Sequence, residues 1–133
     1  MNLLQKFIIE LKSLDPDSDY LVPDIYDLLE PIEDHPNIID VVEEIFEFME
    51  NSPDSDLGAP GPLVHLLEKT KSYENFLYQS IKRKPVFSTV TMLSRRLNSP
   101  DEVTLLKSVL NHPEACEEVK KQAKESLDFQ GEA

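Results

Sequence analysis

The chain has 133 residues, with 26 Asp and Glu against 13 Lys and Arg and a net charge of −13. This length fits one ordinary domain that buries a core without the help of disulfides or metals. The single cysteine, Cys116, excludes a disulfide within the chain. The negative charge opposes direct binding of nucleic acid or of an anionic membrane.

The start of the chain has no signal-peptide pattern, because Lys6 and Glu10 interrupt its apolar residues and no small-residue cleavage site follows. No apolar run approaches the roughly 18–20 residues that span a bilayer. We therefore expect a cytoplasmic protein without a membrane partner.

The net charge is concentrated in the first part of the chain. Residues 1–56 hold 16 Asp and Glu and two Lys, a net charge of −14, whereas residues 57–133 hold 11 Lys and Arg and 10 Asp and Glu. Acidic charge often serves solubility alone. Its confinement to one half favours a basic macromolecular partner, whose association the field would accelerate.

Apolar residues at helical spacing predict three helices in the first half. The first spans 3–14, the second starts near Pro23 and kinks or ends near Glu30, and the third starts at 35–37 and reaches Glu50. Their apolar stripes are Leu3, Leu4, Phe7, Ile8, Leu11 and Leu14; Ile25, Leu28, Leu29 and Ile32; and Ile38, Val41, Val42, Ile45, Phe48 and Met49.

The third helix also carries acids spaced three and four residues apart, which stacks them on one face. These acids are Asp40, Glu43, Glu44, Glu47 and Glu50. Like charges at this spacing destabilise an isolated helix, so packing must hold it and a cationic partner would relieve the repulsion.

The second half opens with the only glycine-rich stretch, 57–62, which is expected to form a turn that enters a helix at 63–68. Further helices are expected at 72–82, 86–97, 100–111 and 113–128. Residues 86–91 have strand-like residue types, but their apolar continuation favours a helix. His-Pro precedes an expected helix at both 35 and 112.

We predict an all-α fold of about seven to eight short helices, in which antiparallel helix pairs stack into a compact HEAT-like bundle. A single domain is expected over 1–133, with an acidic half (1–56) and a near-neutral half (57–133). Residues 99–127 are similar to one helix pair of a HEAT-type repeat.

The sequence holds no recognisable catalytic or metal site. His112 and Cys116 would share a face of one helix, but a structural zinc site needs four ligands, and we expect a capping His112 and a buried Cys116 instead. His65 is expected to be a hydrogen-bonded packing residue. We predict no enzyme activity, no cofactor and no metal.

A basic cluster in the second half is expected to pair with the chain's own acids or to lie in solvent, rather than to bind nucleic acid. It comprises Lys82, Arg83, Lys84, Arg95 and Arg96.

The acidic helices at 24–50, the turn Asp56-Leu57-Gly58-Ala59-Pro60-Gly61-Pro62-Leu63-Val64-His65 and the short helices that follow resemble small helical immunity proteins. These belong to bacterial contact-dependent growth inhibition and polymorphic toxin systems. The resemblance implies that the chain binds one cognate toxin domain, a basic nuclease, and occludes its active-site cleft. The implied contact residues are Asp24, Asp27, Asp40, Glu43, Glu44, Glu47, Asp54 and Asp56.

Two other classes stay open from the sequence. A general helical adaptor or scaffold would have an exposed apolar groove and bind with weak salt dependence. An enzyme that uses Cys116 or a carboxylate pair would have a deep pocket with a strongly perturbed pKa beside those residues.

Overall fold

The computed structural model describes residues 2–58 and 61–131. Within these ranges the chain forms eight α-helices and one 3-10 helix and no strand, which confirms the predicted all-α class. None of the described helices is both long enough and apolar enough to cross a membrane.

The helices are short and lie close to the predicted ranges. They are α1 (Leu3–Lys12), α2 (Leu21–Leu29), the 3-10 helix η1 (Ile38–Val41), α3 (Val42–Glu50), α4 (Pro62–Lys69), α5 (Glu74–Arg83), α6 (Phe87–Ser94), α7 (Pro100–Val109) and α8 (Glu117–Phe129). The predicted end of the second helix near Glu30 is confirmed, because Glu30 is the C-cap of α2.

The chain divides into two compact units, Met1–Tyr73 and Glu74–Ala133. The first unit, hereafter unit 1, has 17 Asp and Glu and four Lys, a net charge of −13. The second, unit 2, has nine acidic and nine basic residues and is neutral. The single domain predicted over 1–133 stays a prediction.

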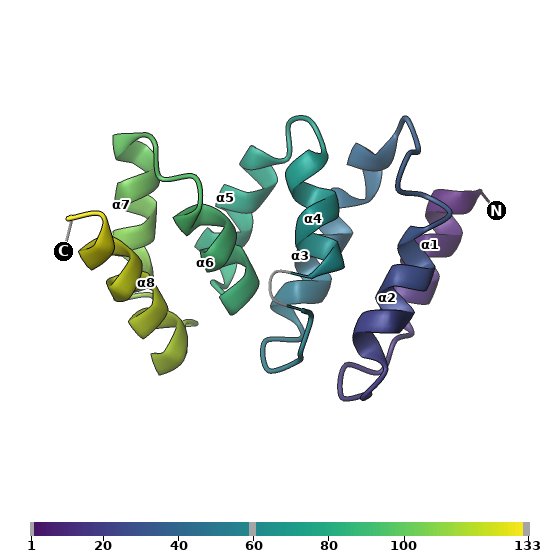
Figure 1. Cartoon of the computed structure of the whole chain (residues 1–133), viewed down its shortest axis with the longest axis horizontal. Helices are drawn as coiled ribbons and strands as arrows, with labels where there is room; N and C mark the ends of the chain where they lie inside the picture. The colour runs from purple at the N-terminus through teal and green to yellow at the C-terminus, as the bar shows by residue number, and fades with distance from the viewer. Residues whose placement is uncertain (1, 59–60, 132–133) are drawn as a thin grey trace. The chain divides into compact units, whose positions relative to one another are not determined.

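Unit 1 has two layers of helices. α1 packs against α3 in one layer, α2 packs against α4 in the other, and α1 contacts α2 across the layers (Figure 1). The buried side chains recur at helical spacing, as Leu4, Phe7 and Leu11 do on α1. The predicted stripes are thus buried in part, because Leu3, which the spacing places in the stripe of α1, is 51% exposed.

Unit 2 consists of two helical hairpins. α5 packs on α6 and α7 packs on α8, while α5 contacts α7 and α6 contacts α8 (Figure 1). The buried stripe of α8 is Val119, Ala123 and Leu127. The predicted antiparallel pairing of the helices at 100–111 and 113–128 is confirmed.

Two predicted helix starts lie too early in the sequence. The third helix opens as η1, where the N–H of Asp40 donates to the carbonyl of Asn37 (2.9 Å), and regular α-helix begins only at Val42. The last helix begins at Glu117 rather than at 113. In both places a His-Pro turn comes first, because the histidine ring accepts a backbone N–H and closes the chain locally.

The start of α6 shows why residues 87–91 are helical, with Val86 as the extended N-cap. The hydroxyl of Thr89 accepts the N–H of Val86 (3.2 Å) and donates to its carbonyl (3.1 Å). The first bond gives an acceptor to the Val86 N–H, a donor that the helix itself leaves free. The second adds to the bond that the Val86 carbonyl accepts from the Val90 N–H at 3.0 Å. The local cap and the buried Val90, Met92 and Leu93 outweigh the strand-like residue types.

Candidate protein-interaction surface

All eight acidic residues implied as partner contacts belong to unit 1. Asp24 and Asp27 lie on α2, Asp40 on η1, Glu43, Glu44 and Glu47 on α3, and Asp54 and Asp56 in the segment after α3. Seven of these side chains are exposed and Glu44 is half-buried. None belongs to the apolar core.

These eight carboxylates have no cationic partner within the described part of the chain. No ion pair joins any of them to a Lys or Arg there, and the described ion pair of unit 1 joins Lys6 to Glu10 at 3.8 Å. Only Asp56 accepts a described hydrogen bond, from the N–H of Gly58 at 3.0 Å. The acidic side chains are therefore available to external cations.

The tertiary structure brings two of the implied contacts together with two acids that sequence reasoning missed. Asp54 and Asp56 line a hollow of about 310 Å³ with Asp17 and Asp19. The segments that carry them lie at the same end of unit 1, after α1 and after α3 (Figure 1). The run Asp15-Pro16-Asp17-Ser18-Asp19 predicts only a turn, although it holds three acids against two in the loop at 51–56.

The remaining acids are divided between the two layers of unit 1. Asp24 and Asp27 are on α2, in the layer with α4, whereas Glu43 and Glu47 are on α3, in the layer with α1. These two groups cannot be separated from the sequence, because spacing along the chain does not define which helices share a layer.

The turn before α4 requires glycine at two positions. Gly58 and Gly61 have φ of 97° and 91°, and a Cβ on Gly61 would lie 1.9 Å from the carbonyl oxygen of Leu57. Pro62 then occupies the first position of α4. The predicted turn is thus confirmed where it is described; Ala59 and Pro60 of the same motif lie outside the described residues.

His65 is exposed, and no described hydrogen bond involves its side chain. The prediction that it is a packing residue is therefore wrong. Helical geometry explains the error, because Leu63, Val64, Leu66 and Leu67 on either side of His65 are buried and leave His65 on the outer face of α4. The imidazole ring of His65 therefore lies on the surface of α4.

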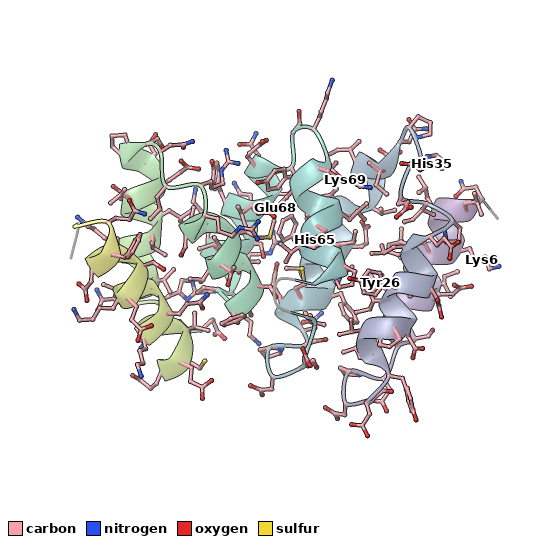
Figure 2. The ribbon with its side chains drawn as sticks, in the orientation of Figure 1. Lys6, Tyr26, His35, His65, Glu68 and Lys69 are labelled. Carbon is pink, nitrogen blue, oxygen red and sulfur yellow. The ribbon has the colours of Figure 1, made fainter. Side chains whose placement is uncertain are left out.

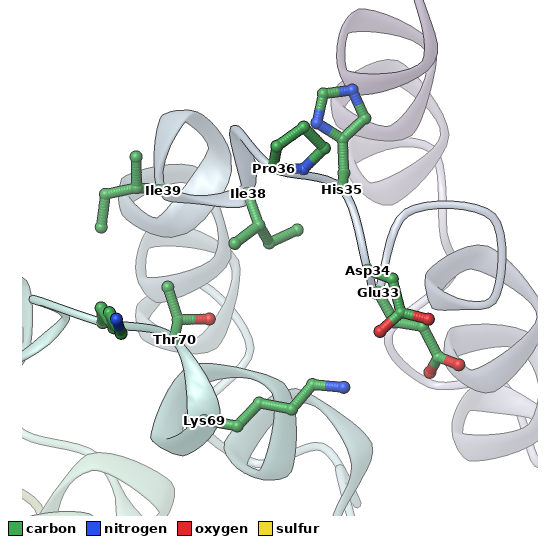
Figure 3. A pocket seen from close by; sticks show the side chains of 9 residues that line it. Glu33, Asp34, His35, Pro36, Ile38, Ile39, Lys69 and Thr70 are labelled. Carbon is green, nitrogen blue, oxygen red and sulfur yellow. The ribbon is translucent and has the colours of Figure 1, made fainter.

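Two adjoining pockets flank this part of unit 1. A pocket of about 180 Å³ lies between α2 and α4, next to Tyr26 and His65 (Figure 2). A second, of about 410 Å³, is lined by Glu33, Asp34, His35, Pro36, Ile38, Ile39, Lys69, Thr70 and Lys71. Lys69 extends towards the side from which Glu33 and Asp34 project, while the His35 ring turns away from it (Figure 3).

Unit 2 holds a second polar cluster, around the buried carboxylate of Glu102. Arg96 Nε donates to it at 2.7 Å and the Tyr78 hydroxyl at 2.8 Å, and the Asn98 N–H and Ser99 hydroxyl each donate at 3.2 Å. Burial raises the pKa of Glu102, but the hydrogen bonds from Arg96, Tyr78 and Asn98 together lower that pKa below its ordinary value.

The pKa of Tyr78 is raised, whereas that of Glu102 is lowered. Burial and the hydrogen bond to Glu102 raise the pKa of Tyr78 above 10.0. A groove of about 650 Å³ beside this cluster is lined by Tyr78, Lys82, Ser99, Asp101, Glu102, Thr104, Leu105 and Ser108. Four hydrogen-bond donors already surround the carboxylate of Glu102. We therefore interpret this cluster as a structural link between α5 and the start of α7.

The sequence-derived candidates for chemistry do not come together in the structure. Cys116 is exposed at the N-cap of α8, which corrects the expectation that it is buried. His112 lies in the preceding turn rather than on the same helix, and its Nε2 contacts the carbonyl oxygen of Lys82 at 2.7 Å. Among the described residues, no group of three or more His, Cys, Asp or Glu is placed to hold a metal ion.

The basic cluster of the second half is in part paired, as expected. Arg96 forms an ion pair with Glu102 at 2.7 Å, whereas the side chain of Lys82 is exposed.

Comparison with protein-family models, with curated proteins and with solved structures gives no match for this chain.

Proposed function

We propose that this chain is an immunity protein that binds a cognate toxin domain, a basic nuclease, and neutralises it by covering the active-site cleft with acidic side chains of unit 1. The observation that carries this proposal is the segregation of charge. Unit 1 holds the entire net charge of −13, and unit 2 is neutral. A nuclease cleft is built to hold phosphates, so exposed carboxylates can take their place.

The free carboxylates support the same proposal. Ion pairs within the chain would neutralise the acids, but the eight implied contacts lack them in the described residues. Mutual repulsion of these acids costs stability in the free protein, and a cationic surface relieves it. The resulting association is fast and weakens as salt is added.

The direct test is co-expression with the product of the gene immediately upstream. We expect that product to arrest growth when expressed alone, and this chain to restore growth and to co-purify with it. A harmless neighbour that does not bind would refute the cognate-toxin function and would leave a general helical adaptor as the leading reading.

Charge reversals then test the acidic surface, one layer of unit 1 at a time. One variant carries Asp24→Lys and Asp27→Lys on α2, and another carries Glu43→Lys and Glu47→Lys on α3. The matched control reverses two exposed acids of α8 in unit 2, Glu118 and Glu125. At least one unit 1 variant should bind about tenfold or more weakly than the control, a change of about 1.4 kcal/mol.

If both unit 1 variants bind as tightly as the control, the acidic surface does not contact the partner. Affinity that is unchanged between low and physiological salt would also contradict the electrostatic mechanism, and it would favour the adaptor reading.

A further inference from the structure

The pocket between α2 and α4 combines apolar walls with an aromatic ring at its mouth. Leu29 and Leu66 are buried, with exposed fractions of 4% and 3%, and Pro62 is buried beside them. Tyr26 lines the same pocket with 54% of its surface exposed (Figure 2). The volume of the pocket, about 180 Å³, suits a single side chain rather than a larger ligand.

Polar groups are placed at the rim of this pocket. Glu33 supplies a carboxylate from the segment after α2, and His65 and Lys69 lie on α4. All three side chains are exposed, and no ion pair joins Glu33 to Lys69 within the described residues. The carboxylate is consequently free to pair with a group that enters from outside.

This set of walls matches the chemistry of an arginine side chain. The aliphatic stem of arginine packs on apolar residues while its charged end stays near the surface. The planar guanidinium stacks on an aromatic face and donates paired hydrogen bonds to a carboxylate. Leu29 and Leu66 would pack against the aliphatic stem. The guanidinium would stack on the ring of Tyr26 and pair with the carboxylate of Glu33.

The charge around the pocket favours a cationic ligand over an anionic one, although the charge of Lys69 repels a cation. Asp27 and Glu30 are exposed close to Tyr26 in the sequence, and unit 1 as a whole carries −13. An anion would meet Lys69 and His65 but would also enter this negative field.

We propose that the pocket between α2 and α4 receives one arginine side chain of the basic partner, with Tyr26 and Glu33 as the residues that recognise it. This inference rests on the proposed function for the source of the arginine, and it adds a specificity pocket to an otherwise diffuse acidic surface. It also assigns a role to the turn at 57–62, which positions Pro62 and α4 as one wall.

The test uses the whole protein, labelled with ¹³C at its methyl groups, and three blocked tripeptides. Acetyl-Ala-Arg-Ala-amide is the probe, acetyl-Ala-Glu-Ala-amide is the anionic arm, and acetyl-Ala-Gln-Ala-amide is the neutral arm. The arginine peptide should shift the methyl signals of Leu29 and Leu66 in a saturable manner, and the other two should not. Absence of such shifts at low salt, or larger shifts with the glutamate peptide, would overturn the proposal.

Substitutions with opposite expected effects on binding test the assignment further. Glu33→Gln should weaken binding of the arginine peptide about two- to fivefold, and Tyr26→Ala by a similar factor. Lys69→Gln should tighten it, because a like charge is removed from the rim. Asp17→Asn, an exposed acid of unit 1 outside the pocket, is the matched control for the change of net charge and should have the smallest effect. Weaker binding by the Lys69→Gln variant would identify an anion pocket instead.

Failure of this inference is distinguishable from failure of the proposed function. If the toxin binds and is neutralised equally well by Glu33→Gln, Tyr26→Ala and the control, the pocket is not the arginine site while the immunity function stands. If no toxin is found but the arginine peptide binds with the expected pattern, the pocket chemistry stands and the proposed function fails.

Discussion

His35 and His112 occupy the same kind of turn, one in each unit. The N–H of Asn37 donates to Nδ1 of His35 at 3.0 Å, and the N–H of Glu114 donates to Nδ1 of His112 at 3.0 Å. An Nδ1 that accepts places the ring proton of the neutral imidazole on Nε2. In His112 that Nε2–H donates to the carbonyl of Lys82, which ties the turn before α8 to the end of α5.

The two histidines should therefore differ in their contribution to stability. His112→Ala removes the turn hydrogen bond and the bond to Lys82, whereas His35→Ala removes the turn bond alone. We expect His112→Ala to lower the unfolding free energy by about 1–3 kcal/mol and His35→Ala by about 1 kcal/mol less. Urea denaturation followed by circular dichroism measures both. Equal losses would mean that the Lys82 contact contributes nothing.

Glu102 should make unit 2 sensitive to acid. Its folded pKa lies below its unfolded pKa, so the stabilisation is present above the ordinary glutamate pKa and is lost as the pH falls through the lowered value. Glu102→Gln should cost roughly 1–3 kcal/mol at neutral pH, and the difference from the wild type should shrink in acid. Denaturation series at several pH values measure this.

Asp101→Asn is the control for that series, because Asp101 is the exposed neighbour of Glu102 in the first turn of α7. Its stability should follow the wild-type pH profile. A Glu102→Gln variant with the same profile as Asp101→Asn would show that the cluster does not favour the carboxylate.

Gly61 should be the least replaceable glycine of the described chain. Gly61→Ala forces a Cβ to within 1.9 Å of the Leu57 carbonyl oxygen at a φ of 91°, and should cost at least about 2 kcal/mol. Gly131 also has a positive φ, of 77°, but a Cβ there meets nothing within 4 Å. Gly131→Ala should thus cost only about 1 kcal/mol. Thermal unfolding compares the two variants, and a Gly61→Ala protein as stable as Gly131→Ala would contradict the turn geometry.

Phe46 rather than Phe48 should be the aromatic anchor of α3. Phe46 is fully buried and Phe48 only half-buried. Phe46→Ala is expected to lower the unfolding free energy by about 3–5 kcal/mol, because it leaves a cavity in the core, and Phe48→Ala by clearly less. Comparison of their urea midpoints tests this. The reverse order would place α3 in a different rotation about its axis.

Salt should stabilise unit 1 more than unit 2. Screening weakens repulsion among the unpaired acids of unit 1, while unit 2 has no net charge to screen. Amide hydrogen exchange at 20 and 300 mM NaCl is the measurement, with ionic strength the only variable. Protection in α2 and α3 should rise more than in α7 and α8, and a uniform change would show that repulsion among the acids does not destabilise unit 1.

The sequence by itself determined the helical class, most helix ranges and the location of the negative charge, because these depend on local spacing and on composition. The pattern predicts a helix from residue 100, and the structure has Ser99 as the N-cap of α7, its hydroxyl accepting the Glu102 N–H. The sequence did not determine which residues of a helix are innermost, because helical spacing predicts Phe48 in the buried stripe of α3 whereas the structure buries Phe46.

Only the tertiary structure decided which distant residues meet. The Glu102 cluster joins residues 24 positions apart in sequence, the acidic hollow joins two separate loops, and the pocket beside Tyr26 joins α2 to α4. Helical periodicity fixes a side chain's angle about its own axis, but helix packing fixes what lies opposite it. For that reason, the pocket beside Tyr26 follows from the packing of unit 1, whereas the exposure of His65 follows from its place between the buried residues of α4.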